Sequence, residues 1–241
     1  MNGRTDERLF DRRLFAAAAI AFPLIVLAGF GRTYYVRGFF NAPPLPSGLV
    51  HLHGFLMSAW VVLFVTQVYL ISSKEIRLHQ RLGYGGVALG ALIIATGLPT
   101  ALRAAKYGSA SSPAGVPPLA FLAVPLFDLV MFAIFFGGAI YYRRRPSAHK
   151  SLMLLTAINF VPPAIARIQI APLQAAGPLW FFGFPTIVAL LCVGLDARRY
   201  GHVNKVFLVG TLLLIASYAG RLVLMGTGAW MTVATFLTSF V

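Results

Sequence analysis

The sequence predicts an all-α fold, a polytopic transmembrane helix bundle of about seven helices with its N-terminus in the cytoplasm and its C-terminus outside. The composition is too apolar for a water-soluble core, with 59% hydrophobic residues, 11% charged residues and a mean hydropathy of +0.80. Apolar runs recur at the length of about 20 residues that a helix needs to cross a bilayer. Because these runs are long and unbroken, a closed β-barrel is excluded.

The first apolar run follows several arginines and is not followed by a small-residue cleavage site, so we expect an uncleaved helix. The sixth run is the shortest and contains Pro185, which leaves a six-helix count with one re-entrant segment as an alternative. In chain order the runs are 14–31, 49–71, 82–105, 118–142, 151–170, 179–195 and 206–224. We expect a single integral membrane domain over 1–241, made of a basic cytoplasmic N-terminus (1–13), the bundle (14–227) and a short apolar tail (228–241).

Two runs contain residues that shape a helix. In the third run, glycines at spacings of three, four and seven lie on one helical face, which favours close packing. They are Gly83, Gly86, Gly90 and Gly97. The fifth run contains Pro162 and Pro163, which predict a kink or local unwinding.

The basic residues set the orientation. Of the 20 Lys and Arg residues, 14 lie at the N-terminus or in loops that share its side of the membrane, which places that side in the cytoplasm. The net charge of +14 is scattered through short loops, so we expect lipid headgroups as anionic neighbours and no nucleic acid. We expect a multi-pass protein of a bacterial cytoplasmic membrane. Cys192 is the only cysteine, which excludes an intrachain disulfide and a thiolate cluster.

Three charged residues lie inside apolar runs, namely Asp128, Arg167 and Arg221. Such residues mark a functional site by default, because a charge at membrane depth is costly. Asp128 is expected about 15 Å deep, where it would pair with Arg167 or Arg221. The plainer alternatives are an interfacial arginine and a simple helix-to-helix tie.

The same outer half of the bundle contains further polar side chains. The candidate ligand-binding set is His53, Asp128, Asn159, Arg167, Tyr218 and Arg221. Its excess of positive charge would suit an anionic or polar headgroup, a quinone carbonyl or a haem propionate.

Three histidines stand at the cytoplasmic starts of predicted helices, namely His79, His149 and His202. A helix N-terminus disfavours imidazolium, which leaves a neutral ring that can ligate a metal or haem iron. The alternative is that they are interfacial residues beside basic loops.

At these motifs the chain resembles an uncharacterised family of bacterial polytopic membrane proteins. The resemblance rests on His53-Gly-Phe, Leu78-His-Gln-Arg-Leu-Gly, His149-Lys-Ser-Leu-Met, Arg167, Arg221 and Gly226-Thr-Gly-Ala-Trp230. It covers roughly residues 50–230 and implies no known activity. The placement of histidines near helix ends is also weakly similar to membrane b-type cytochromes. However, the outer layer carries histidines on only one helix, which argues against two stacked bis-histidine haems.

The sequence leaves three functions open, and whether the protein is an enzyme stays open with them. The first is a redox protein that binds haem b or a quinone between its helices, with His79 and His149 as the axial pair. The second is a carrier or receptor for a small anionic or amphiphilic molecule, and the third is a non-catalytic subunit of a membrane-protein complex. Hydrolase and nucleotide-driven pump functions are poorly supported, because no nucleophile with an evident base and no phosphate-binding glycine loop occurs.

Overall fold

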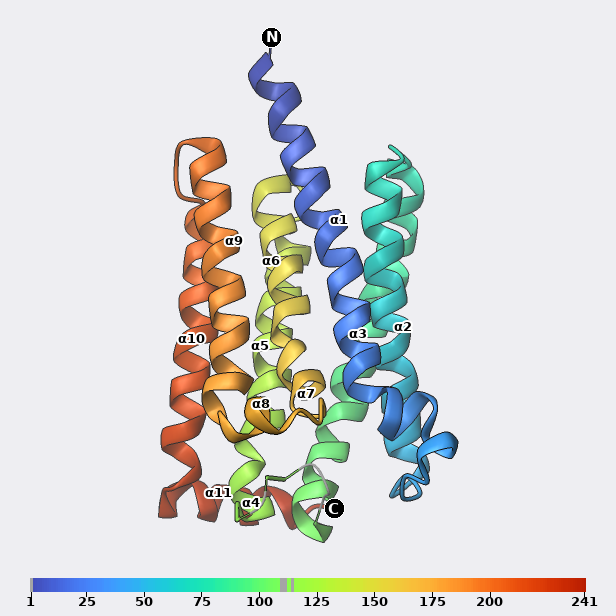
Figure 1. Ribbon diagram of the computed structural model, residues 1–241, viewed down its shortest axis with the longest axis vertical. Coiled ribbons are helices and arrows are strands. Elements are labelled where there is room, and N and C mark those ends of the chain that lie inside the picture. Colours follow the sequence, from blue (N-terminus) through green and yellow to red (C-terminus); the bar gives the residue numbers. More distant parts are fainter. Residues whose placement is uncertain (1, 109–111, 114) are drawn as a thin grey trace.

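The computed structural model describes residues 2–108, 112–113 and 115–241, with side chains from Leu9 onward, and this part of the chain contains helices and no strands (Figure 1). Six helical segments are long and apolar enough to cross a membrane. They are Leu9–Tyr35, Gly48–Ser72, Ile76–Tyr107, Pro118–Tyr141, Leu179–Tyr200 and Lys205–Met225. The predicted all-helical, multi-pass membrane architecture is confirmed at this level.

Eleven α-helices are present in the described chain, with short π- or 3₁₀-helical turns between some of them. The α-helices are α1 (Asn2–Phe30), α2 (Gly48–Ser72), α3 (Ile76–Tyr107), α4 (Pro118–Phe121), α5 (Ala123–Tyr141), α6 (Pro146–Asn159), α7 (Val161–Ile165), α8 (Ala171–Ala175), α9 (Phe184–Tyr200), α10 (Lys205–Met225) and α11 (Gly228–Thr238). The turns are η1 (Gly31–Tyr35), η2 (Arg37–Phe40) and η3 (Leu179–Gly183).

Local sequence explains where several helices begin and end. The hydroxyl of Ser47 caps α2 by accepting from the backbone N–H of Val50, and the Asn204 side chain caps α10 by accepting from that of Phe207. Helix α9 ends at Gly201, whose φ of 71° lies in the left-handed region that favours glycine. These three residues therefore mark the start of α2, the end of α9 and the start of α10.

The predicted fifth run is divided in the structure. Helix α6 ends at Asn159, and the short α7 that follows contains Pro162 and Pro163, so the predicted kink is confirmed. Each piece alone is too short to count among the six candidate spans. In Figure 1, α6 continued by α7 lies along the bundle beside α5, and the count of seven spans stays a prediction.

The glycine face of α3 receives side chains from its neighbours, as predicted. A Cβ added to Gly86 would lie 3.1 Å from Leu63 of α2, and one added to Gly90 would lie 2.5 Å from the Phe136 ring of α5. Phe136 belongs to an aromatic cluster in which Trp60 packs edge to face against Phe132 and Phe136. The centre of the bundle is therefore filled between α2, α3 and α5.

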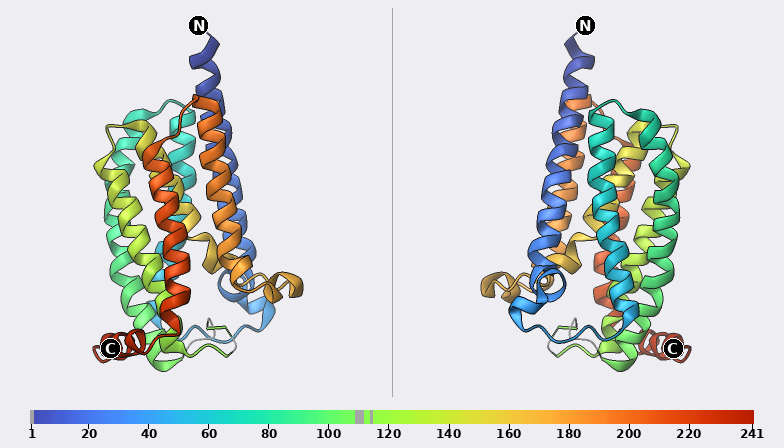
Figure 2. Two further views of the ribbon diagram at one scale, coloured as in Figure 1. Left: turned by 90° about the vertical axis from the view of Figure 1, so that its left-hand side faces the viewer. Right: turned by 90° about the vertical axis from the view of Figure 1, so that its right-hand side faces the viewer.

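The C-terminal segment is more ordered than the sequence predicted. The segment predicted as an apolar tail folds as α11, which lies across the end of the bundle in Figures 1 and 2. The indole N–H of Trp230 donates to the carbonyls of Leu119 and Ala120, at 3.1 and 3.2 Å, and this fastens α11 to α4. The N-terminus lies at the opposite end of the bundle.

Candidate functional site

A buried ion pair joins α5 to α10. Arg221 Nη1 lies 2.6 Å from Asp128 Oδ1, and the two residues are 0% and 6% exposed. The guanidinium also donates to the hydroxyl of Ser217 at 2.8 Å and to the Ser217 carbonyl at 3.3 Å. The predicted pairing of Asp128 is thus made with Arg221, and the charge of each partner is compensated inside the bundle.

Two further predicted residues belong to the same polar network. The amide of Asn159 donates to the carbonyl of Asp128 at 2.9 Å, which ties α6 to α5. The Tyr218 ring lies 5.0 Å from the Arg221 guanidinium and stacks on Phe182. The Asn159 amide oxygen and the Tyr218 hydroxyl are buried and have no hydrogen-bond partner among the described residues. Four of the six predicted ligand-binding residues are therefore together.

The other two residues of that set make different contacts. His53 Nδ1 lies 3.0 Å from the hydroxyl of Thr96, so His53 joins α2 to α3. Arg167 donates to the Pro163 carbonyl at 2.5 Å, and its guanidinium lies 4.5 Å from the centre of the Phe30 ring on α1. The excess of positive charge expected around Asp128 is therefore not assembled from these residues.

His79 and His149, at the end of the bundle that carries the N-terminus, are neighbours. Their ring centres lie 6.3 Å apart, and the ring planes are at 87°. His149 Nδ1 lies 2.9 Å from the carbonyl of Ala139. Since a carbonyl only accepts, Nδ1 carries the hydrogen, and in the neutral ring Nε2 is then the nitrogen with the lone pair. His79 Nδ1 is buried without a hydrogen-bond partner among the described residues.

Gln67 of α2 also contacts the histidine pair, at His79. Its amide nitrogen donates to the carbonyl of His79 at 3.2 Å, while its amide oxygen is buried without a partner in the described part of the chain. Gly83 follows His79 by one turn on the same face of α3. A Cβ there would come no closer than 4.0 Å to a neighbouring atom, the Gln67 nitrogen. The histidine pair therefore lies beside buried polar atoms, His79 Nδ1 and the Gln67 amide oxygen, that make no hydrogen bond within the described part of the chain.

The third histidine predicted at a helix start, His202, is not part of the pair. His202 is exposed, and its Nδ1 lies 2.9 Å from the carbonyl of Tyr200. Its ring packs edge to face on Tyr200 at 6.4 Å. His202 is therefore a surface residue near the site and serves as an internal control for it.

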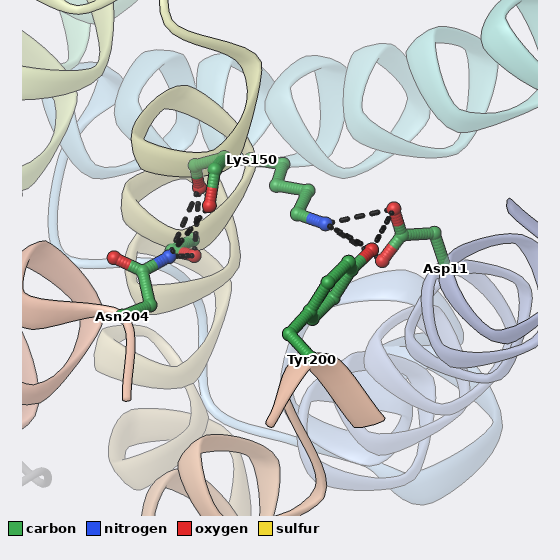
Figure 3. A network of polar contacts seen from close by, with 6 residues as sticks. Asp11, Lys150, Tyr200 and Asn204 are labelled. Atoms are coloured by element: carbon green, nitrogen blue, oxygen red, sulfur yellow. Dashed lines mark hydrogen bonds and ion pairs between the residues drawn. The ribbon is translucent and has the colours of Figure 1, made fainter. Parts of the chain in front are cut away.

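Sequence reasoning missed a polar cluster that joins α1, α6 and α9. Figure 3 shows the Lys150 ammonium between the Asp11 carboxylate and the Tyr200 hydroxyl. Lys150 Nζ lies 2.7 Å from both carboxylate oxygens and 3.2 Å from the hydroxyl, which itself donates to Asp11 at 2.9 Å. Beside it, Asn204 bonds to Ser147 and Ser151, each at 3.0 Å. The only signal in the sequence was the scarcity of acidic residues, six in the chain.

The Lys150 cluster lies at the end of the bundle that carries the N-terminus, where Asp11 and Tyr200 stand at the ends of two candidate spans. Burial by itself lowers the pKa of the Lys150 ammonium, but the hydrogen bond and charge of Asp11, helped by Tyr200, outweigh burial and raise that pKa. Lys150 therefore keeps its charge at neutral pH and holds three helices together next to His149.

No group of three or more His, Cys, Asp or Glu side chains that could hold a metal ion occurs in the described residues. Comparison of the chain with protein-family models, with curated proteins and with solved structures gives no match. The family resemblance drawn from the motifs therefore stays a prediction.

Proposed function

We propose that this chain is a redox protein of the bacterial cytoplasmic membrane that binds one haem b between His79 and His149, near the cytoplasmic face. The haem iron would supply one-electron transfer, because it changes between the ferric and ferrous states. His79 and His149 would hold the haem iron through their imidazole nitrogens.

The geometry of the two rings carries this proposal. Two imidazoles bound on opposite sides of one iron, with iron–nitrogen bonds of about 2 Å, hold their ring centres roughly 6 Å apart. The ring centres of His79 and His149 are separated by 6.3 Å. The two imidazoles come from different helices, His79 from α3 and His149 from α6.

The hydrogen bonding of His149 supports the same assignment. A histidine ligand usually donates its other ring N–H to a carbonyl, which fixes the tautomer and the ring orientation. His149 makes this contact with Ala139, so its Nε2 is the available ligand atom. The buried Nδ1 of His79, which has no hydrogen-bond partner among the described residues, is a second nitrogen that could hold such a group.

The proposed membrane arrangement has seven passes, with α6 and α7 together as the fifth. The two chain ends lie at opposite ends of the bundle, as an odd number of passes requires. The bias of Lys and Arg towards the N-terminal end supports a cytoplasmic N-terminus. This orientation places the histidine pair and the Lys150 cluster on the cytoplasmic side.

The test is an absorption spectrum of the full chain, purified in mild detergent, before and after reduction with dithionite. We expect a stoichiometric haem b spectrum that is lost or becomes high-spin in His79→Ala and in His149→Ala. The matched control is His202→Ala, which removes an exposed histidine of the same end of the bundle and should leave the spectrum unchanged. A colourless protein that also fails to take up added haem would reject the proposal.

A second candidate function rests on the outer polar network. The unpartnered Asn159 oxygen and Tyr218 hydroxyl beside the Asp128–Arg221 pair favour a carrier or receptor for a small polar or amphiphilic molecule, such as a quinone. In that case a ligand should be extracted with the purified protein, and Tyr218→Phe should reduce its amount. The control is Tyr69→Phe, since Tyr69 is 66% exposed on α2.

A further inference from the structure

A hollow lies at the end of α5, where the chain turns into α6. It has a volume of about 240 Å³ and is lined by Tyr141, Tyr142, Arg144 and Arg145. These residues follow one another where α5 ends and the chain turns into α6. The hollow is therefore built by one short connection and lies where a membrane span ends, since the fourth span extends to Tyr141.

The charge of the hollow is positive without a compensating acid. Its lining contains two guanidinium groups and two phenol rings, and no Asp or Glu. The Arg145 guanidinium lies 5.7 Å from the centre of the Tyr142 ring, which holds it beside the hollow. Arg143, in contrast, donates to the carbonyl of Ile140 at 3.2 Å and is not among the lining residues.

The two guanidinium groups are the favourable element for an anion. An arginine presents a planar fork of N–H donors that matches the oxygens of a phosphate and binds them by paired hydrogen bonds. Helix α6 begins with Pro146 directly after Arg145 and is not part of the lining.

We infer that this hollow, lined by Tyr141, Tyr142, Arg144 and Arg145, binds the phosphate of an anionic phospholipid headgroup. A lipid is favoured over a free anion by position, because Tyr141 is 77% exposed at the end of a membrane span. Tyrosine at that depth lies at headgroup level with its ring against acyl chains. Basic pockets at the ends of membrane helices bind acidic headgroups in this way.

The experiment measures binding of a fluorescent phosphatidylglycerol to the full chain, purified and delipidated in a neutral detergent. We expect saturable binding, and a loss of affinity of roughly tenfold or more in Arg144→Gln/Arg145→Gln. The control variant is Arg77→Gln/Arg81→Gln, which removes the same charge from two exposed positions on α3 at the same end of the bundle. Circular dichroism and thermal unfolding establish that both variants are folded.

Three results would overturn the inference. An equal loss in both double variants would show that general charge attraction accounts for binding. Binding of phosphatidylcholine as tight as that of phosphatidylglycerol would show that the hollow does not select an anionic headgroup. Inorganic phosphate that displaces the lipid at comparable concentration would assign the hollow to a free anion. Because the readout is lipid binding, each result is independent of whether haem is present at His79 and His149.

Discussion

At the scale of single residues, the buried Asp128–Arg221 pair is the main constraint on the interior. Its two side chains lie on α5 and α10 and are almost fully removed from solvent. Breaking such a pair by removing one partner is costly, because an uncompensated charge remains buried, whereas replacing both partners by apolar residues is often tolerated. The pair thus connects α5 to α10, and its contribution to stability is measurable when only one of the two partners is replaced.

We therefore expect Arg221→Met alone to destabilise the protein by about 3–5 kcal/mol, and Asp128→Leu/Arg221→Met to be clearly milder than the sum of its single changes. The measurement is a double-mutant cycle of unfolding in mixed detergent micelles. The comparison cycle combines Asp128→Leu with Arg167→Met. It should be additive to within about 0.5 kcal/mol, because Arg167 packs on Phe30 instead. Strong coupling of Asp128 to Arg167 would contradict the observed pairing.

The sequence was sufficient to find the charged residues but not all of their partners. Charges inside apolar runs stand out by composition, which is why Asp128 and Arg221 were identified. The choice between Arg167 and Arg221 depends on the break between α6 and α7, which directs Arg167 towards α1. The Lys150 cluster escaped notice because it assembles residues 139 and 50 positions apart in the chain.

At the scale of elements, the helix boundaries followed from apolar length and turn residues, while close approaches between helices did not. The proline break in the fifth run was predictable because proline removes a backbone donor. The contact of α1 with α7 was not, because it rests on one glycine. A Cβ on Gly29 would overlap the backbone carbonyl of Ala164, which has no room to move.

We expect Gly29→Ala to destabilise the bundle by roughly 1–3 kcal/mol, as overpacking does in other tight interiors. The matched control is Gly31→Ala, two residues further along the same span, where nothing lies within 4 Å of an added Cβ. Thermal unfolding in detergent, followed by circular dichroism, compares the two variants. Equal melting temperatures would mean that α1 and α7 do not touch as described.

At the scale of the whole molecule, apolar length and the distribution of Lys and Arg specify a membrane bundle, and the structure adds that the two chain ends lie at opposite ends of it. The proposed seven passes with a cytoplasmic N-terminus account for the distribution of Lys and Arg and for the positions of the two chain ends. The alternative six-pass arrangement would bring both termini to one side. The topology is thus open to a direct chemical test.

Replacement of the only cysteine by alanine gives a background for labelling single cysteines placed at exposed serines. We expect a cysteine at Ser239, after α11, to react in intact cells with a membrane-impermeant maleimide. A cysteine at Ser73, between α2 and α3, should react only after the cells are broken. Labelling of both positions from the same side would contradict the proposed seven passes.

The central claim is that His79 and His149 are the axial ligands of one haem, and electron paramagnetic resonance of the oxidised, purified full chain tests it most directly. Two imidazole ligands would give the haem iron a low-spin ferric signal. The signal should disappear in His149→Ala and persist in His202→Ala. A high-spin haem signal, or no haem signal from a protein supplied with haem, would contradict the account.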